Sequence, residues 1–84
     1  MTDSLGEVRV VLAGVAEQIG SAYQYAGLAR ARIADAVAVL DGLGEQHSEP
    51  LVPLELRRAA DELERVLGLI SAGAGAVADI DARL

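Results

Sequence analysis

The sequence contains no cysteine and no lysine, and only two of its 84 residues are aromatic. Without cysteine the chain has neither a disulfide framework nor a thiolate metal site. All seven cations are therefore arginines, and 13 carboxylates outnumber them to give a net charge of −6. A nucleic-acid binder needs a positive face to contact phosphates. We therefore expect a protein partner and no nucleic acid.

Long hydrophobic runs are also missing, although apolar residues make up 52% of the chain. A membrane-spanning helix needs about 20 apolar residues, and the longest uncharged run covers only residues 66–78. The first eight residues are acidic, whereas a secretory signal begins with basic residues. We expect no membrane span, and a location in the cytoplasm or outside the cell after export without a cleavable signal peptide.

One break divides the chain, at residues 42–52. Gly42 and Gly44 open this stretch, and glycine after a periodic run is typical of a helix C-terminus. Pro53 suits the first turn of a new helix, where its missing N–H costs nothing. The sequence predicts one domain over residues 1–84, with helices at about 5–41 and 53–83 and a connector at 42–52. A connector this short makes the helices antiparallel.

Apolar or small residues recur at alternating spacings of three and four on both sides of the connector. A period of 3.5 residues is typical of supercoiled helices. We therefore predict an all-α fold, an antiparallel two-helix hairpin with long, coiled-coil-like helices. The predicted interhelical seam consists of Leu5, Val8, Leu12, Val15, Ile19, Ala22, Ala26, Ala29, Ile33, Ala36, Leu40 and Leu43 with Leu56, Ala59, Leu63, Val66, Ile70, Gly73, Val77, Ile80 and Leu84.

The register of the hairpin is predicted by charge. If the connector centres near residue 48, the uncharged run 18–29 lies opposite the uncharged run 66–78. The charged residues that this register brings together are Arg30 and Arg32 with Glu62 and Glu64, and Asp35 with Arg57 and Arg58. Both features favour the same register.

The uncharged runs 18–29 and 66–78 predict a larger assembly. A helix that is neutral on every face is normally buried on every face, and two helices alone cannot achieve that. We therefore expect a second hairpin to complete a four-helix bundle, as a dimer or higher oligomer. The predicted interface consists of Ile19, Ala22, Tyr23, Tyr25, Ala26, Ala29, Ile33, Leu63, Val66, Leu67, Ile70, Gly73, Ala74 and Val77.

The sequence offers little chemistry. His47 is the single imidazole, and beside Ser48 in the connector it is interpreted as a solvated loop residue. We predict no enzyme, no catalytic residue, no cofactor and no metal site. The glycines inside the predicted helices include Gly14, Gly20, Gly27, Gly68, Gly73 and Gly75. They are either tolerated in a chain stabilised by packing or allow helices to approach closely at the bundle centre.

A small acidic two-helix hairpin is similar to the Trp-x-Gly hairpin proteins of bacterial type VII secretion. In that family the motif lies at the turn, and the matching place here reads Leu40-Asp41-Gly42, with leucine in place of tryptophan. The resemblance implies pairing as a four-helix bundle, often with a different hairpin, and export of many members. The family's C-terminal export signal contains a tyrosine, and none follows Tyr25 here. This departure indicates export with a partner, or a role inside the cell as a partner or chaperone-like subunit.

Two classes of function stay open at this point. The first is an interaction module that pairs with another helical protein within a secretion or toxin-associated system, as a type VII secretion-associated partner or a secreted hairpin. The alternative is a structural homo-oligomer without a secretion role, in which one surface closes on itself with twofold symmetry. Both need the same apolar face, so the sequence alone does not separate self-pairing from pairing with another hairpin.

Overall fold

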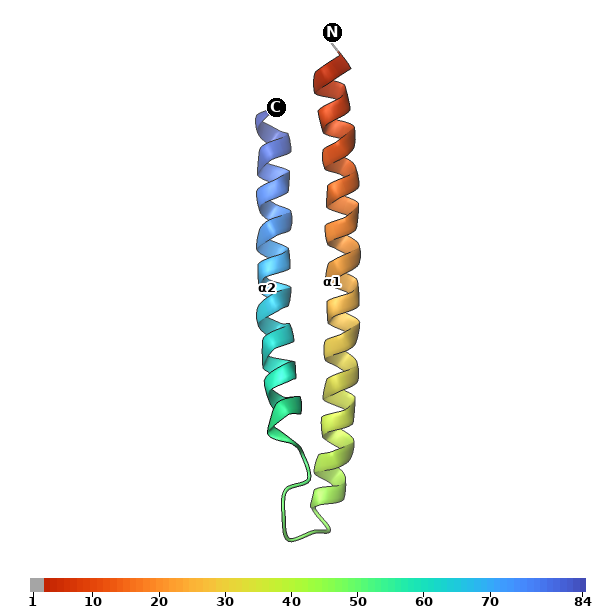
Figure 1. Ribbon diagram of the computed structural model, residues 1–84, viewed down its shortest axis with the longest axis vertical. Helices are drawn as coiled ribbons and strands as arrows, with labels where there is room; N and C mark the ends of the chain where they lie inside the picture. Colours follow the sequence, from red (N-terminus) through yellow and green to blue (C-terminus); the bar gives the residue numbers. More distant parts are fainter. Residues whose placement is uncertain (1–2) are drawn as a thin grey trace.

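A computed structural model of the protein describes residues 3–84. These residues form two long helices, α1 (Asp3–Gly44) and α2 (Leu54–Arg83), joined by one connector. The helices run antiparallel along a rod of 71 × 15 × 14 Å, so that α1 begins and α2 ends at the same end (Figure 1). The predicted all-helical hairpin is confirmed, and the described residues contain no strand.

The end of α1 differs from the sequence-based boundary. The helix continues through Gly42 to Gly44, three residues beyond the predicted end at residue 41. None of the described glycines has a positive φ, so α1 does not end in a left-handed glycine cap. Instead, the amides of Glu45 and Gln46 donate to the carbonyls of Asp41 and Leu43, both at 3.2 Å. These bonds satisfy carbonyls of the last turn that would otherwise lack a partner.

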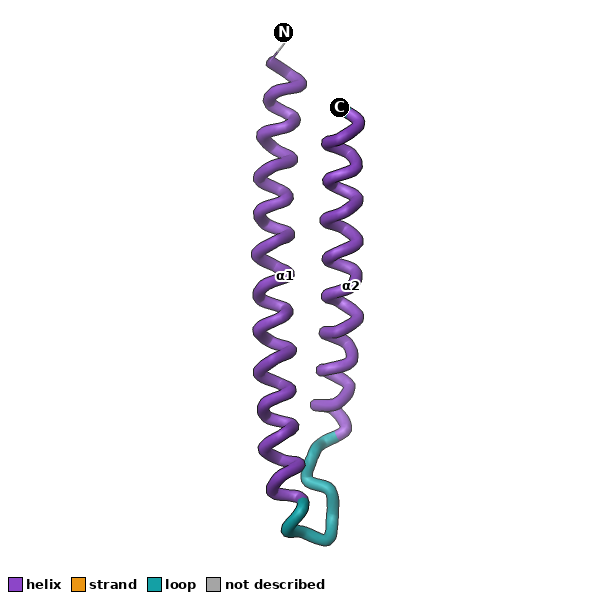
Figure 2. Tube along the Cα trace, turned by 180° about the vertical axis from the view of Figure 1, so that it is seen from behind, coloured by secondary structure: helices purple, strands orange, loops and turns teal. Residues whose placement is uncertain are grey.

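The connector runs from residue 45 to residue 53 and leads directly into α2 (Figure 2). Pro53 is the N-cap, with φ −62° and ψ 141°, and its carbonyl accepts the amide of Leu56 at 3.1 Å. Glu55 lies in the first turn of α2 and Arg83 in the last. Both charges oppose the partial charges of the helix ends and therefore stabilise α2.

The two helices pack along one seam, as the apolar spacing predicts. Among the described residues Leu67 alone is buried, with 8% of its surface exposed. The half-buried side chains of the seam are Leu12, Val15, Ile19, Ala26, Ala29, Ile33, Val37 and Leu40 on α1 and Leu56, Ala59, Ala60, Leu63, Val66, Ile70 and Val77 on α2. The core is therefore one side chain thick, with solvent on both flanks.

Several residues assigned to the seam are exposed. Leu5 and Val8 are exposed because α1, with 42 residues, extends past the end of the 30-residue α2 (Figure 1). Ala36 is exposed, and its neighbour Val37 takes its place in the seam. The other predicted seam residues that are exposed are Ala22, Leu43, Gly73, Ile80 and Leu84.

The helical glycines have open space around them in the hairpin. A Cβ built on Gly68 would meet no described atom within 4 Å outside its own helix backbone, and the same holds for Gly75. Close approach of α1 and α2 therefore does not require these glycines.

Gly68→Ala is expected to raise the free energy of unfolding by up to about 1 kcal/mol, because alanine is the better helix former. The thermal midpoint, followed by far-UV circular dichroism, is the measurement, and Gly75→Ala should act in the same direction. A lower midpoint in both variants would contradict the interpretation that the glycines are merely tolerated.

Candidate interaction surface

The surface of the hairpin is unusually rich in large apolar side chains. Each of fourteen such residues has between 37% and 74% of its surface exposed. They are Leu5, Val8, Val10, Val11, Tyr23, Tyr25, Leu28, Val39, Leu43, Leu51, Leu54, Leu69, Ile80 and Leu84. Among the described residues, large apolar side chains that are exposed therefore far outnumber the one that is buried, Leu67.

The residues predicted to form an interface with a partner divide into two groups. Nine of them lie in the seam between α1 and α2: Ile19, Ala26, Ala29, Ile33, Leu63, Val66, Leu67, Ile70 and Val77. The other five are exposed: Ala22, Tyr23, Tyr25, Gly73 and Ala74. The first group already packs between the two helices of one hairpin. A partner can therefore directly contact only the second, exposed group.

The hairpin has two flanks, one on each side of the seam. We call them the Tyr23 side and the Tyr25 side, because these exposed tyrosines lie two residues apart on α1 and therefore point in different directions. On the Tyr23 side a shallow groove runs between the helices. Its central part is lined by Ile19, Gly20, Tyr23 and Gln24 from α1 and by Ile70, Ser71 and Ala74 from α2.

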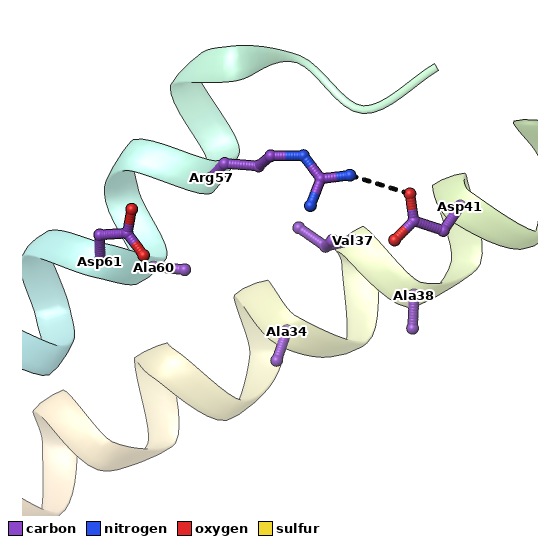
Figure 3. A pocket seen from close by; sticks show the side chains of 7 residues that line it. All are labelled: Ala34, Val37, Ala38, Asp41, Arg57, Ala60 and Asp61. Atoms are coloured by element: carbon purple, nitrogen blue, oxygen red, sulfur yellow. Dashed lines mark hydrogen bonds and ion pairs between the residues drawn. The ribbon is translucent and has the colours of Figure 1, made fainter. Parts of the chain in front are cut away.

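Near the connector the same groove is crossed by an ion pair. Arg57 extends from α2 across Val37 toward Asp41 on α1, and its Nη2 donates to the Asp41 carboxylate at 3.0 Å (Figure 3). The small side chains of Ala34, Ala38 and Ala60 line this part of the groove. The sequence-based register placed Arg57 beside Asp35, and the pairing with Asp41 corrects it.

A second ion pair, Arg30 with Glu64, also joins the helices. The predicted proximity of these two residues is therefore confirmed. In the predicted register, the residue opposite Arg30 would lie two positions further along α2 than Glu64. The residue opposite Asp41 would lie two positions before Arg57. Both pairs are exposed, and such pairs contribute only about 0–1 kcal/mol each. They indicate register more than they add stability.

Glu62 does not pair with α1, contrary to the prediction that placed it beside Arg30 and Arg32. Its carboxylate accepts hydrogen bonds from Arg65, one turn further along α2. These bonds, together with the positive charge of Arg65, lower the pKa of Glu62 below its ordinary value. The stabilisation is therefore present near neutral pH and is lost as the pH falls through this lowered pKa.

The side chains that could take part in catalysis or bind a metal are spread over the described residues. His47 is exposed in the connector, and its amide donates to the Gly44 carbonyl at 3.0 Å. Among residues 3–84 no three metal-binding side chains lie together, and no described helix could span a membrane.

Comparisons with known proteins add no family to this description. No protein-family model, no curated protein and no solved structure matches the chain. The tripeptide Leu40-Asp41-Gly42, which the sequence placed at the turn, lies inside α1 just before its end. Leu40 is half-buried in the seam, and Gly42 is exposed.

Two exposed apolar residues were missed when the interface was predicted from sequence. Val10 and Leu28 are 73% and 49% exposed, on the side of α1 away from the seam. Neither lies at the heptad positions a and d or at the flanking positions e and g, from which the interface was predicted.

Proposed function

We propose that this chain is a non-enzymatic protein–protein interaction module that pairs with another helical hairpin to form a four-helix bundle. The observation that carries the proposal is the imbalance between fourteen exposed large apolar residues and one buried leucine. Soluble monomers rarely expose a contiguous apolar patch larger than a few hundred Å². Pairing removes this surface from water, which is the main driving force for association of proteins.

The chemistry of the surface favours a helical protein as the partner. Residues 18–29 and 66–78, in the middle of the rod, carry no charge. Acidic residues dominate elsewhere, which disfavours nucleic acids and anionic membranes. A long, straight, two-helix face is complementary in shape to another face of the same kind, because side chains of facing helices interdigitate at a shallow crossing angle.

We place the module in a bacterial type VII secretion system, as a subunit that pairs before export or within the cell. The support is the resemblance to the Trp-x-Gly hairpin proteins in size, in hairpin architecture and in the tripeptide Leu40-Asp41-Gly42. Co-purification of the tagged chain with another hairpin protein from a host that has such a system would support this role. Export that is unchanged when that secretion system is inactivated would contradict it.

Pairing predicts the mass of the protein in solution. At micromolar concentration the purified protein is expected to be a dimer or larger, with a mass at least twice 8.7 kDa. Static light scattering after size-exclusion chromatography measures this directly. The mass should be the same at about 50 mM and 500 mM salt, because apolar association depends little on screening.

A stable monomer at micromolar concentration would contradict the proposal. Dissociation at high salt would show that charges rather than the apolar surface hold the assembly. If the protein retained a DNA or RNA strand at low salt, the exposed arginines would have a role in binding nucleic acid and not only a structural one.

A further inference from the structure

The part of α2 beyond residue 70 is packed far less closely on α1 than the part before it. Up to residue 70, the buried or half-buried side chains of α2 are Leu56, Ala59, Ala60, Leu63, Val66, Leu67 and Ile70. Over residues 71–83 Val77 is half-buried and every other residue is exposed. We call residues 71–83 the distal segment; it is the blue end of α2 beside the first half of α1 (Figure 1).

The distal segment is also weakly helical by composition. Gly73 and Gly75 lie in its first half, and glycine is the least favourable residue for a helix after proline. A Cβ built on either glycine would meet no described atom within 4 Å outside its own helix backbone. Most of the stability of a helix in a protein comes from the packing of its apolar face. Here that packing comes down to the side chain of Val77.

The preceding part of α2 is fastened to α1 by charge as well as by apolar packing. The ion pairs Arg30–Glu64 and Arg57–Asp41 join the two helices, and both involve α2 before residue 70. Leu67, with 8% of its surface exposed, belongs to the same part. The two parts of α2 therefore differ in how strongly they are held.

The distal segment covers a half-buried side chain of α1. Leu12 and Ala16 of α1 line a shallow groove together with Ala74, Val77 and Ala78 of the distal segment. Leu12 is half-buried, although the side chains opposite it are mostly single methyl groups. Removal of the distal segment would leave Leu12 open to solvent on the face that it turns to α2.

We propose that the distal segment is a strap that opens locally while residues 54–70 stay packed on α1. Opening exposes little apolar surface, and it restores conformational freedom to the segment. It therefore requires less free energy than unfolding of the whole hairpin, as in other proteins that open in separate units. The strap controls access to the first half of the seam on α1. It concerns contacts within one hairpin and does not depend on pairing.

Hydrogen exchange of the natural chain, followed by mass spectrometry of peptic fragments at about 0.1 µM protein, tests the strap directly. Relative to their intrinsic rates, the amides of residues 71–83 are expected to exchange at least about tenfold faster than those of residues 58–70. Equal protection of the two parts would overturn the inference, because α2 would then open only as a whole.

A variant with Gly73→Ala and Gly75→Ala is expected to hold the strap closed. Exchange of residues 71–83 should slow at least about fivefold, because alanine favours the helix over the open segment. The matched control carries Gly14→Ala and Gly20→Ala, which add the same two methyl groups at exposed positions of α1. Since α1 stays helical when the strap opens, the control should leave this exchange unchanged. Equal slowing by both variants would overturn the inference.

Thiol labelling tests what the strap uncovers, because the natural chain has no cysteine. Leu12 and Leu40 are both half-buried leucines of α1, and Leu40 lies next to Asp41, which pairs with Arg57 in the firmly held part of α2. We expect Leu12→Cys to react with a small maleimide at least about tenfold faster than Leu40→Cys. Adding Gly73→Ala and Gly75→Ala should slow the first reaction alone. Equal rates for the two thiols would contradict the strap.

Light scattering on the natural chain separates this inference from the proposed function. A dimeric mass together with equal exchange of the two parts of α2 would overturn the strap and leave pairing intact. A monomeric mass together with fast exchange of residues 71–83 would contradict pairing and support the strap.

Discussion

The Ile70→Asp variant is expected to lose helicity and assembly together. Ile70 is half-buried in the seam, where it lies with Ile19 and Tyr23 beside the central groove. A carboxylate at this position would be withdrawn from water without a partner, since residues 18–29 and 66–78 carry no charge. Burying an unpaired charge costs several kcal/mol, which is comparable to the whole stability of a small domain. Far-UV circular dichroism and light scattering measure the two losses.

A matched variant, Gly75→Asp, separates the effect of the position in the seam from the effect of the added charge. Gly75→Asp adds the same carboxylate to the same uncharged run, but at an exposed residue whose Cβ would meet no described atom within 4 Å. It is expected to keep its helicity, mass and thermal midpoint. If Ile70→Asp retained the spectrum and midpoint of the natural chain, the assignment of the seam on α2 would be wrong.

The hairpin itself could be predicted because one physical signal repeats along almost the whole chain. Apolar residues at alternating spacings of three and four occur on both sides of the only proline-containing segment, which suffices to place two helices against each other. The proximity of Arg30 and Glu64 followed from the same register. The two helices and this proximity depend only on the spacing of residues along the chain, which can be read directly from the sequence.

The details that could not be predicted depend on the exact number of residues per helical turn, which the spacing of apolar residues does not specify. Counting by heptads assumes 3.5 residues per turn, whereas a straight helix has 3.6, so the inward face drifts by about 20° per heptad. Over five heptads this drift is about one residue position. That accounts for Val37 replacing Ala36 in the seam, and Gly44 rather than Leu43 being half-buried near the end of α1.

The candidate interface was predictable in kind but not residue by residue. Its sequence signal was the absence of charge over residues 18–29 and 66–78, which marks a level of the rod but not a side of it. Which flank is open depends on where the seam lies, and hence on packing. Leu67 was assigned to the partner interface because it flanks the heptad positions, yet it is the most enclosed side chain of the hairpin.

The Leu67→Ala variant is expected to show the largest loss of stability among simple truncations. Leu67 is 8% exposed, and truncation of a buried leucine to alanine costs 2–5 kcal/mol in a closed core. We expect about 2 kcal/mol here, because a core one side chain thick can close over the vacated space. For a chain of this length that loss lowers the thermal midpoint by roughly 10 °C.

Leu54→Ala is the matched control for Leu67→Ala, since the same atoms are removed from a leucine on the same helix that is 56% exposed. Its midpoint should stay close to that of the natural chain, because surface substitutions usually change stability by less than about 0.5 kcal/mol. Equal destabilisation by the two truncations would mean that the seam does not enclose Leu67 in solution. If Leu67→Ala lowers the midpoint more than Leu54→Ala while the assembly mass stays unchanged, the Leu67 side chain stabilises the hairpin itself. If mass and helicity are lost together, the side chain stabilises the bundle.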